Sequence, residues 1–290
     1  MSHHPPFKQV EASRPDFDGQ NKLSYTKTPN PSWQVGTGRS KSSSTSSSSP
    51  TSPSRQQLGQ DKVVEIDPSQ VENKGKLYKM LISAITPRPI AFVSSYDKDG
   101  NSNLAPFSYF NMVAHDPPTV MVSFTHPNPN EMKGTCENIL NTKEFTTNII
   151  SEDFVEAANY TSIDAPKGQS EWPLSGLTMV ESKTVKAPRV GESRFSMECV
   201  LLHSYDIVND SNERTGTVVL GRVKVFHIDE RVIDRESFLV DTKRLEPVSR
   251  LGGISYGRTT EAYELPRPVW KDEKEKGEVK EVLNKDDSKL

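Results

Sequence analysis

Three strand-like runs separated by turn signals fill residues 86–126, and this stretch constrains the fold more than any other. Residues 90–96 are apolar and β-branched, and residues 119–124 alternate as a strand does. The Asp-Gly pair at residues 99–100 is a strong hairpin signal, because a tight turn needs positive φ and glycine has no Cβ to resist it. The Asp-Pro-Pro sequence at residues 116–118 blocks a helix. The stretch therefore predicts successive β-strands.

The run between these strands, residues 105–111, mixes aromatic side chains with a hydroxyl and an amide. Pro106 cannot donate to a β-ladder, so the segment belongs at a sheet edge or a bulge. One interpretation is a barrel strand with two aromatic side chains in the core. The other is a surface on which a flat ring lies against the strand, with Ser108 at its polar edge. Both interpretations are open from the residues alone.

Composition and charge exclude some classes of function. The chain of 290 residues has a formal net charge of −3, which argues against a surface for nucleic acid or an anionic membrane. No apolar run approaches the roughly 20 residues that span a bilayer. The N-terminus lacks the apolar core of a secretory signal. We therefore expect a cytoplasmic protein with no nucleic-acid or membrane partner.

Neither the cysteines nor the histidines predict a metal site. Cys136 and Cys199 have no spacing motif, so we expect free buried thiols in a reducing compartment. The histidines are scattered along the chain, and a lone histidine is more often structural than a ligand. His126 is the one to follow, because it comes directly after the third strand-like run.

Composition also divides the chain into three parts. Residues 1–60 are rich in Ser, Pro, His and Lys and cannot bury enough apolar surface to offset their ordering entropy, which predicts a disordered arm. Residues 61–268 are the predicted folded domain, and residues 269–290 are a charged, disordered tail. Tyr25 and Trp33 lie among turn residues of the arm. Their segment is either a solvated linker or a short arm that docks Trp33 on the domain.

Further elements follow from local patterns. Apolar residues at helical spacing predict a helix over residues 73–85, and Asn130 is a suitable N-cap for a helix over residues 131–141. Residues 194–208 and 217–228 are predicted as long strands joined by a turn. Two such strands suit a closed or split barrel, where pairing removes exposed edges.

Short motifs in a fixed order carry a resemblance to a known family. They are Thr-Pro-Arg-Pro-Ile-Ala at 86–91, Asn-Leu-Ala-Pro-Phe-Ser-Tyr-Phe-Asn at 103–111, Asp-Pro-Pro at 116–118, Lys-Gly-Thr at 133–135, Asn-Ile at 138–139, and Arg-Leu-Gly-Gly at 250–253 with Tyr256. Over about residues 77–268 the chain resembles the flavin reductase-like family. The resemblance implies a mainly β fold with a few helices, an FMN-binding split β-barrel, and a homodimer. Hydrophobic periodicity shows none of the redox chemistry.

The predicted helix start near Lys133 suits the phosphate of FMN. A helix N-terminus presents free N–H groups and about half a positive charge. Lys133 adds a full charge, Thr135 adds a hydroxyl, and Asn138 lies one turn past Gly134 on the same side. By itself, a lysine in a first turn is usually a solvated charge. The resemblance favours the phosphate site.

The flavin ring needs a flat slot with polar groups at one edge. Residues 105–111, which include Pro106, Phe107 and Ser108, fit this slot. Residues 123–126 fit it too, because they offer backbone groups and the hydroxyls of Ser123 and Thr125. Arg88 could approach the pyrimidine or the phosphate, and an inter-strand ion pair is an equal alternative. His126 is the candidate for contact with a nicotinamide.

The function that the resemblance implies is NAD(P)H-linked flavin reduction or a flavoprotein oxygenase step, with NADH or NADPH as electron donor and a flavin or small molecule as substrate. Hydride transfer needs two rings stacked at short distance rather than a protein acid or base. No catalytic residue is therefore assigned, and a non-enzymatic FMN-binding or interaction module is the alternative.

Overall fold

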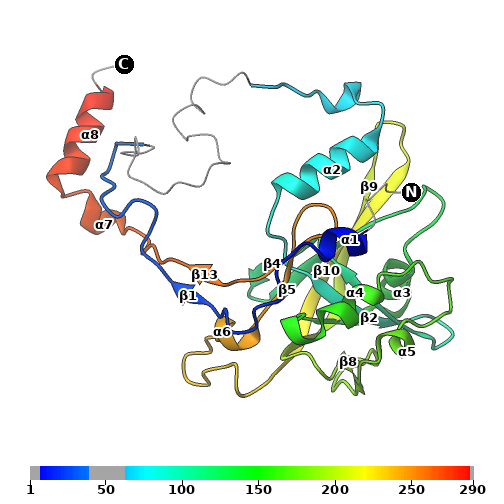
Figure 1. Ribbon diagram of the computed structural model, residues 1–290. Helices are drawn as coiled ribbons and strands as arrows, with labels where there is room; N and C mark the ends of the chain where they lie inside the picture. Colours follow the sequence, from blue (N-terminus) through cyan, green and yellow to red (C-terminus); the bar gives the residue numbers. More distant parts are fainter. Residues whose placement is uncertain (1–6, 39–62, 288–290) are drawn as a thin grey trace. The chain divides into compact units, whose positions relative to one another are not determined.

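The computed structural model describes residues 7–38 and 63–287. The chain forms two compact units (Figure 1). The first comprises Met1–Lys22 and Asn73–Thr259, and it contains the main sheet. The second comprises Leu23–Glu72 and Thr260–Leu290.

A seven-stranded antiparallel sheet, in the order β3-β2-β6-β9-β10-β5-β4, forms the body of the first unit. Its strands are β2 (Ala91–Tyr96), β3 (Ser102–Phe107), β4 (Phe110–His115), β5 (Pro118–Thr125), β6 (Glu144–Asn148), β9 (Phe195–Val208) and β10 (Arg214–Ile228). β3 and β4 lie at opposite ends of this strand order, although only two residues, Ser108 and Tyr109, separate them along the chain. The sheet must therefore curl until its edges approach each other, and β3 contacts β5 there. The Ser123 N–H donates to the Tyr109 carbonyl at 2.8 Å, which extends the β4–β5 ladder to the residue before β4. This mainly β barrel confirms the predicted fold class.

The closure corrects the prediction of one strand over residues 105–111. β3 ends at Phe107 and β4 begins at Phe110, because one continuous strand cannot occupy both ends of the sheet. Pro106 lies opposite Phe92 of β2. Its missing amide proton is tolerated because β3 is an edge strand of the ladder.

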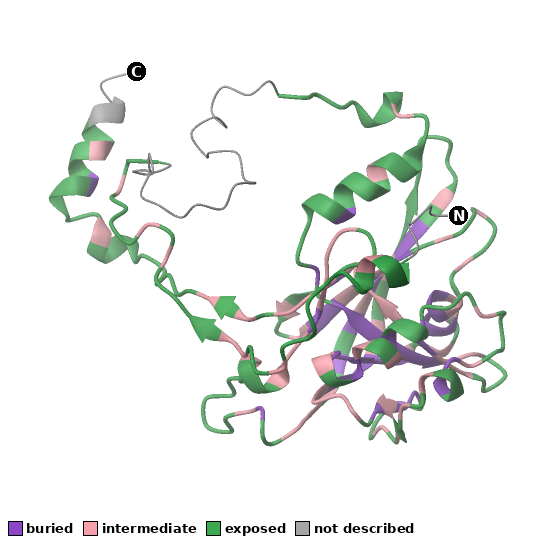
Figure 2. Ribbon diagram, in the orientation of Figure 1, coloured by how far each residue is buried: buried purple, intermediate pink, exposed green. Residues whose placement is uncertain are grey.

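β9 and β10 confirm the predicted pair of long strands, which run from Phe195 opposite Ile228 to Val208 opposite Arg214. Gly221 of β10 lies so close to the Phe145 ring that a Cβ would overlap it. The curled sheet thereby encloses an apolar core, seen as buried strands in Figure 2. Its fully buried members include Val93, Val122, Phe124, Ile139, Phe145 and Val219.

A second apolar cluster covers the other side of β2, because successive residues of a strand point to opposite faces. Phe92 and Leu104 pack there with Phe154 and Trp172. The cluster joins the sheet to α4 (Val155–Tyr160) and α5 (Trp172–Ser175). The segment after β6 is thus fixed against the barrel.

Shorter elements surround the sheet. They are α1 (Phe7–Glu11), α2 (Lys74–Ala84), α3 (Gly134–Thr142), η3 (Glu152–Phe154), β7 (Met179–Val180), β8 (Arg189–Val190), α6 (Thr242–Leu245), β11 (Ser249–Arg250) and β12 (Tyr256–Gly257). None of the helices in the described ranges has both the length and the apolar content to cross a membrane.

The helix predicted over residues 73–85 is confirmed as α2. The Asn73 side chain caps it by accepting the Gly75 N–H at 3.0 Å. Its apolar stripe is not covered in the unit, since Ile82 is buried whereas Met80 and Leu81 are exposed. The helix therefore offers an apolar face to a further surface.

The predicted start of the next helix was wrong. α3 begins at Gly134 with Lys133 at the N-cap, and Asn130 caps nothing. The Glu131 N–H donates to the Asn128 carbonyl at 3.2 Å, and this tight turn holds residues 128–131 out of the helix. The helix therefore begins three residues later than predicted.

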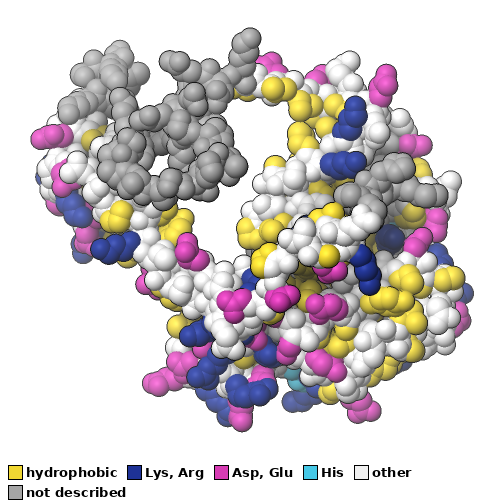
Figure 3. Space-filling model, viewed as in Figure 1, with side chains coloured by type: hydrophobic (Ala, Val, Ile, Leu, Met, Phe, Trp, Pro, Cys, Tyr) yellow, Lys and Arg dark blue, Asp and Glu magenta, His cyan; other side chains and the backbone are white. Residues whose placement is uncertain are grey.

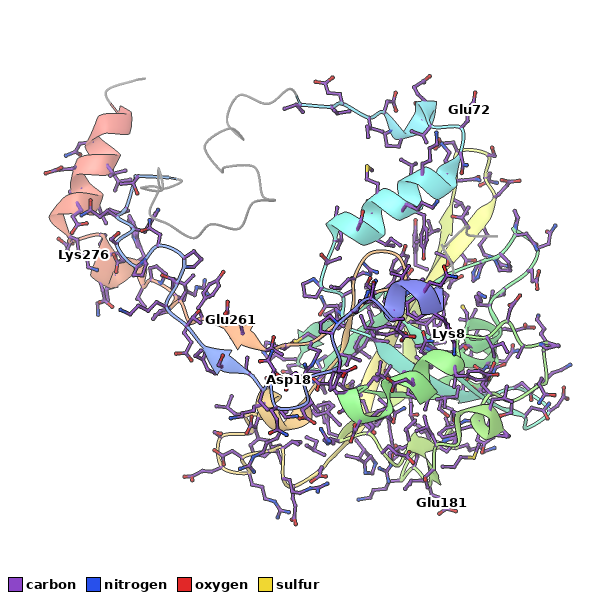
Figure 4. All side chains as sticks on the ribbon, in the orientation of Figure 1. Lys8, Asp18, Glu72, Glu181, Glu261 and Lys276 are labelled. Atoms are coloured by element: carbon purple, nitrogen blue, oxygen red, sulfur yellow. The ribbon has the colours of Figure 1, made fainter. Side chains whose placement is uncertain are left out.

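The second unit contains β1 (Ser24–Tyr25), η2 (Pro68–Gln70), β13 (Glu261–Ala262), α7 (Trp270–Glu273) and α8 (Gly277–Asp287). β1 pairs in parallel with β13, whose Glu261 is labelled in Figure 4. Within this unit Gly36 packs against Val282 of α8. Parts of the predicted arm and tail are thus helical or extended here. Residues 39–60 of the predicted arm lie outside the described residues, and docking of Trp33 on the barrel stays a prediction.

Candidate active site

A groove of about 800 Å³ runs along the barrel between the end of β3, the start of α3 and residues 161–169. Eight of the residues that the sequence singles out line it together. They are Pro106, Phe107, Ser108, Ser123, Thr125, Lys133, Thr135 and Asn138. Arg88 and His126 do not line the groove, and each lies behind a residue that does.

One end of the groove, which we call the anion end, combines helix N–H groups with a positive charge, and these features suit an anion. Lys133 lies at the N-cap of α3, where the first-turn N–H groups have no partner within the helix. Its side chain is exposed, and its ammonium forms no ion pair with any residue in the described ranges. A Cβ at Gly134 would meet no atom within 4 Å, so a bulky group can approach the backbone closely.

Thr135 and Asn138 hold this helix start in place. The Thr135 hydroxyl donates to Asn103 Oδ1 at 2.5 Å, and the Asn138 amide donates to Ser95 Oγ at 3.1 Å. Both side chains are buried. Their bonds tie α3 to the β2–β3 hairpin, so each residue lines the groove while its polar group is already engaged with the barrel.

The wall beside the anion end is apolar with a polar rim. The Phe107 ring packs edge-on against Phe124 with centroids 4.7 Å apart, and it also lines the groove. Phe107 is therefore a core aromatic, as one interpretation has it, and it also faces the groove. That a flat ring lies against it stays a prediction. Ser123 and Thr125 alternate along β5 and present hydroxyls to the same groove.

Arg88 lies behind Ser108. Its guanidinium donates to the carbonyls of Ile82 at 2.6 Å, Ile85 at 2.7 Å and Leu251 at 3.0 Å, and to Ser108 Oγ at 3.3 Å. The inter-strand ion pair that the sequence leaves open is therefore not formed with any described carboxylate.

His126 lies at the base of the anion end. Its Nδ1 accepts the Lys133 N–H at 3.3 Å, so Nε2 carries the proton and donates to Thr217 Oγ1 at 2.8 Å. Thr217 in turn donates to Asp206 at 2.7 Å. Burial and the Arg214 charge lower the pKa of His126, while Asp206 opposes them. The neutral imidazole thus fixes the backbone before α3, and contact with a nicotinamide stays a prediction.

The sequence did not single out Glu171, which lines the groove. Its buried carboxylate accepts the Asn103 amide at 2.9 Å and the Leu104 N–H at 3.0 Å. Burial raises the pKa of Glu171, against the hydrogen bonds from Leu104 and Asn103 that lower it. The available signal was its place in the long polar segment at residues 161–175, since long loops are often functional.

Residues 83–248 match the sequence model of the flavin reductase like domain. The chain belongs to the flavin reductase-like family. Nitrilotriacetate monooxygenase component B of Bacillus cereus is 36% identical, with a TM-score of 0.67 over 71% of this chain and 100% of that one. The 2-nitrobenzoate 2-nitroreductase of Pseudomonas fluorescens is 28% identical, with a TM-score of 0.62 over 71% of this chain and 98% of that one.

The barrel architecture of this flavin reductase-like chain is shared more widely. A protein from Shewanella frigidimarina, assigned as a flavin reductase with a split barrel domain, is 22% identical with a TM-score of 0.60 over 69% of this chain and 96% of that one. The fold is therefore a split β-barrel. The matched residues 83–248 include the β3 wall, the start of α3 and Glu171.

Proposed function

We propose that this protein binds FMN in the groove and reduces it with NADH or NADPH. It would act as a flavin reductase or perform the reductive step of a flavoprotein oxygenase. The observation that carries the proposal is one groove that joins a helix N-terminus and Lys133 to an aromatic wall at Phe107. A phosphate and a flat ring are the two parts of FMN that need these surroundings.

The residues of the groove fit this cofactor. Lys133 and the first N–H groups of α3 would hold the phosphate, and the open space at Gly134 admits it. Thr135 and Asn138 would keep that helix start in position. The ring would lie against the wall of Pro106, Phe107 and Ser108 with Ser123 and Thr125 opposite. Bound FMN would supply the hydride acceptor, and the protein would bind, orient and shield it.

Two relatives support a redox role. One is named a monooxygenase component and the other a nitroreductase. Both names indicate redox chemistry on a small molecule, so we infer a small-molecule or flavin acceptor for this chain as well. The face drawn in Figure 3 has Lys and Arg interspersed with Asp and Glu, which agrees with a small-molecule partner rather than a nucleic acid.

The test is spectroscopic. The purified protein, supplied with FMN and FAD in turn, should retain FMN on gel filtration and show the flavin absorption band. Anaerobic addition of NADH or NADPH should bleach this band. Retention of FMN without bleaching by either nucleotide would favour a non-enzymatic FMN-binding module. Failure to retain any flavin would contradict the proposal.

A further inference from the structure

Arg88 is a buried cation without an anionic partner among the described residues. The residue is 8% exposed. Its backbone is held by two hydrogen bonds, since the Arg88 N–H donates to the Arg250 carbonyl at 3.0 Å and the Arg250 N–H donates to the Arg88 carbonyl at 2.9 Å. The four acceptors of its side chain are three carbonyls and one hydroxyl. The carbonyls of Ile82 and Ile85, at the C-terminal end of α2, bring only partial negative charge. A buried charge is normally paired with a full opposite charge, and no described carboxylate supplies one here.

Ser108 transmits this charge to the groove. Its Oγ accepts from Arg88 Nε at 3.3 Å, and the same residue lines the groove. With a lone pair engaged by Arg88, the hydroxyl proton is free to donate to a ligand. The charge also reaches the neighbouring wall residue: burial and Tyr78 raise the pKa of Tyr109, and Arg88 opposes that rise.

We propose that Arg88, acting through Ser108, is a positioning residue that stabilises negative charge on a ring in this groove and so raises its reduction potential. The inference rests on the proposed function. In that reaction a hydride, one proton with two electrons, leaves the dihydronicotinamide, which becomes the oxidised nicotinamide cation. Bound FMN would accept the hydride and with it one negative charge, which the Arg88 cation would stabilise. A preorganised donor with a cation behind it favours the state in which that charge has developed.

The experiment compares the midpoint potentials of FMN bound to the full-length protein and its variants, by spectroelectrochemistry at pH 7. In Arg88→Gln the affinity for reduced FMN should fall about tenfold more than the affinity for oxidised FMN, which corresponds to a potential about 30 mV lower. Ser108→Ala should lower the potential in the same direction. Arg88→Lys, which keeps the charge, should stay closer to the wild-type value.

Arg189→Gln is the matched control. Arg189 is also partly buried and donates to a backbone carbonyl, that of Glu181 at 3.2 Å, which is labelled in Figure 4. The midpoint potential of FMN bound to the Arg189→Gln variant should equal the wild-type value. Ser108→Ala removes only one hydroxyl. If Arg88→Gln does not fold, the midpoint potential of FMN bound to Ser108→Ala decides the test.

An unchanged potential in the folded Arg88→Gln and Ser108→Ala variants, with FMN still bound, would overturn this inference alone. Equal shifts in Arg189→Gln and Arg88→Gln would also overturn it, because the effect would then be a general one of charge. Failure of the wild-type protein to bind FMN would overturn the proposed function together with it.

Discussion

At the scale of single residues, Lys133 is where cofactor binding is most directly tested. We expect Lys133→Ala to weaken FMN binding about ten- to a hundredfold, because one charge-assisted hydrogen bond contributes about 1.5–3 kcal/mol. Quenching of flavin fluorescence on titration into apoprotein measures the affinity. Lys224→Ala, which changes an exposed lysine of β10, should bind as the wild type does. Equal affinities for FMN in wild type and Lys133→Ala would place the phosphate elsewhere.

His126 should make the stability of the protein depend on pH. Burial and Arg214 lower its pKa in the folded state, with Asp206 opposing, so the folded protein binds fewer protons than the unfolded chain below the ordinary histidine pKa of about 6.5. The contribution of neutral His126 to the free energy of unfolding is therefore complete above that pH, and it is lost as the pH falls toward the folded-state pKa of His126. Urea denaturation from pH 8 to pH 5 should show wild type losing stability relative to His126→Asn. Parallel pH profiles would contradict this role.

At the scale of elements, we expect the hydrogen bond between Asn138 and Ser95 to contribute more to folding stability than to FMN affinity. Asn138→Ala and Ser95→Ala should each reduce the free energy of unfolding by about 1–3 kcal/mol, because each removes a buried hydrogen bond between the two side chains. The double variant should lose less than the sum of the two. Urea denaturation provides these values. If Asn138→Ala keeps full stability yet binds FMN poorly, the amide contacts the cofactor directly.

The sequence predicted elements defined by local patterns and missed those defined by distant partners. The strand over residues 90–96 and the hairpin at residues 99–100 follow from side-chain alternation and turn chemistry, and the structure contains both. The break between β3 and β4 depends on where the two ends of the sheet meet, which no local pattern encodes. Glu171 likewise gains its role from Asn103 and Leu104, 68 and 67 residues away.

The candidate site, too, has features that local patterns predict and features that depend on distant partners. The motifs around Ser108 and Lys133 placed residues that the fold gathers into one groove. The sequence could not show that the Thr135 side chain is already engaged by Asn103, 32 residues earlier. Nor could it show that Arg88 lacks a carboxylate partner among the described residues, since that depends on which carbonyls of α2 and residue 251 surround it.

At the scale of the whole molecule, the N-terminal segment contributes to the first unit. Arg258 donates to the carbonyls of Asp18 at 3.1 Å and Asn21 at 3.0 Å, and its guanidinium lies 4.2 Å from the centre of the Phe17 ring. Deleting residues 1–22 should keep the fold and FMN binding, because the barrel core lies outside that segment. The melting temperature should fall by about 2–4 °C for each kcal/mol lost. Calorimetry checks this, and an unchanged melting temperature would show that these contacts contribute nothing to stability.

We also propose a homodimer for the whole molecule. α2 exposes Met80 and Leu81 at 40% and 47%, and the neighbouring Tyr78 lines the groove. An uncovered apolar helix face beside a cofactor groove is suited to a second copy that covers both. Light scattering should give twice the chain mass of 32.4 kDa.

Two substitutions in α2, one on its apolar face and one at a polar position, test the homodimer. Leu81→Glu should give monomers that retain FMN poorly, because a buried carboxylate would oppose association and the open side of the groove would lose its cover. Lys79→Glu, a change of charge at an exposed polar position of α2, should remain dimeric with FMN bound. A wild-type protein that is monomeric at micromolar concentration and still holds FMN tightly would contradict the dimer. The groove of one chain would then enclose the cofactor alone, and the apolar face of α2 would serve another purpose.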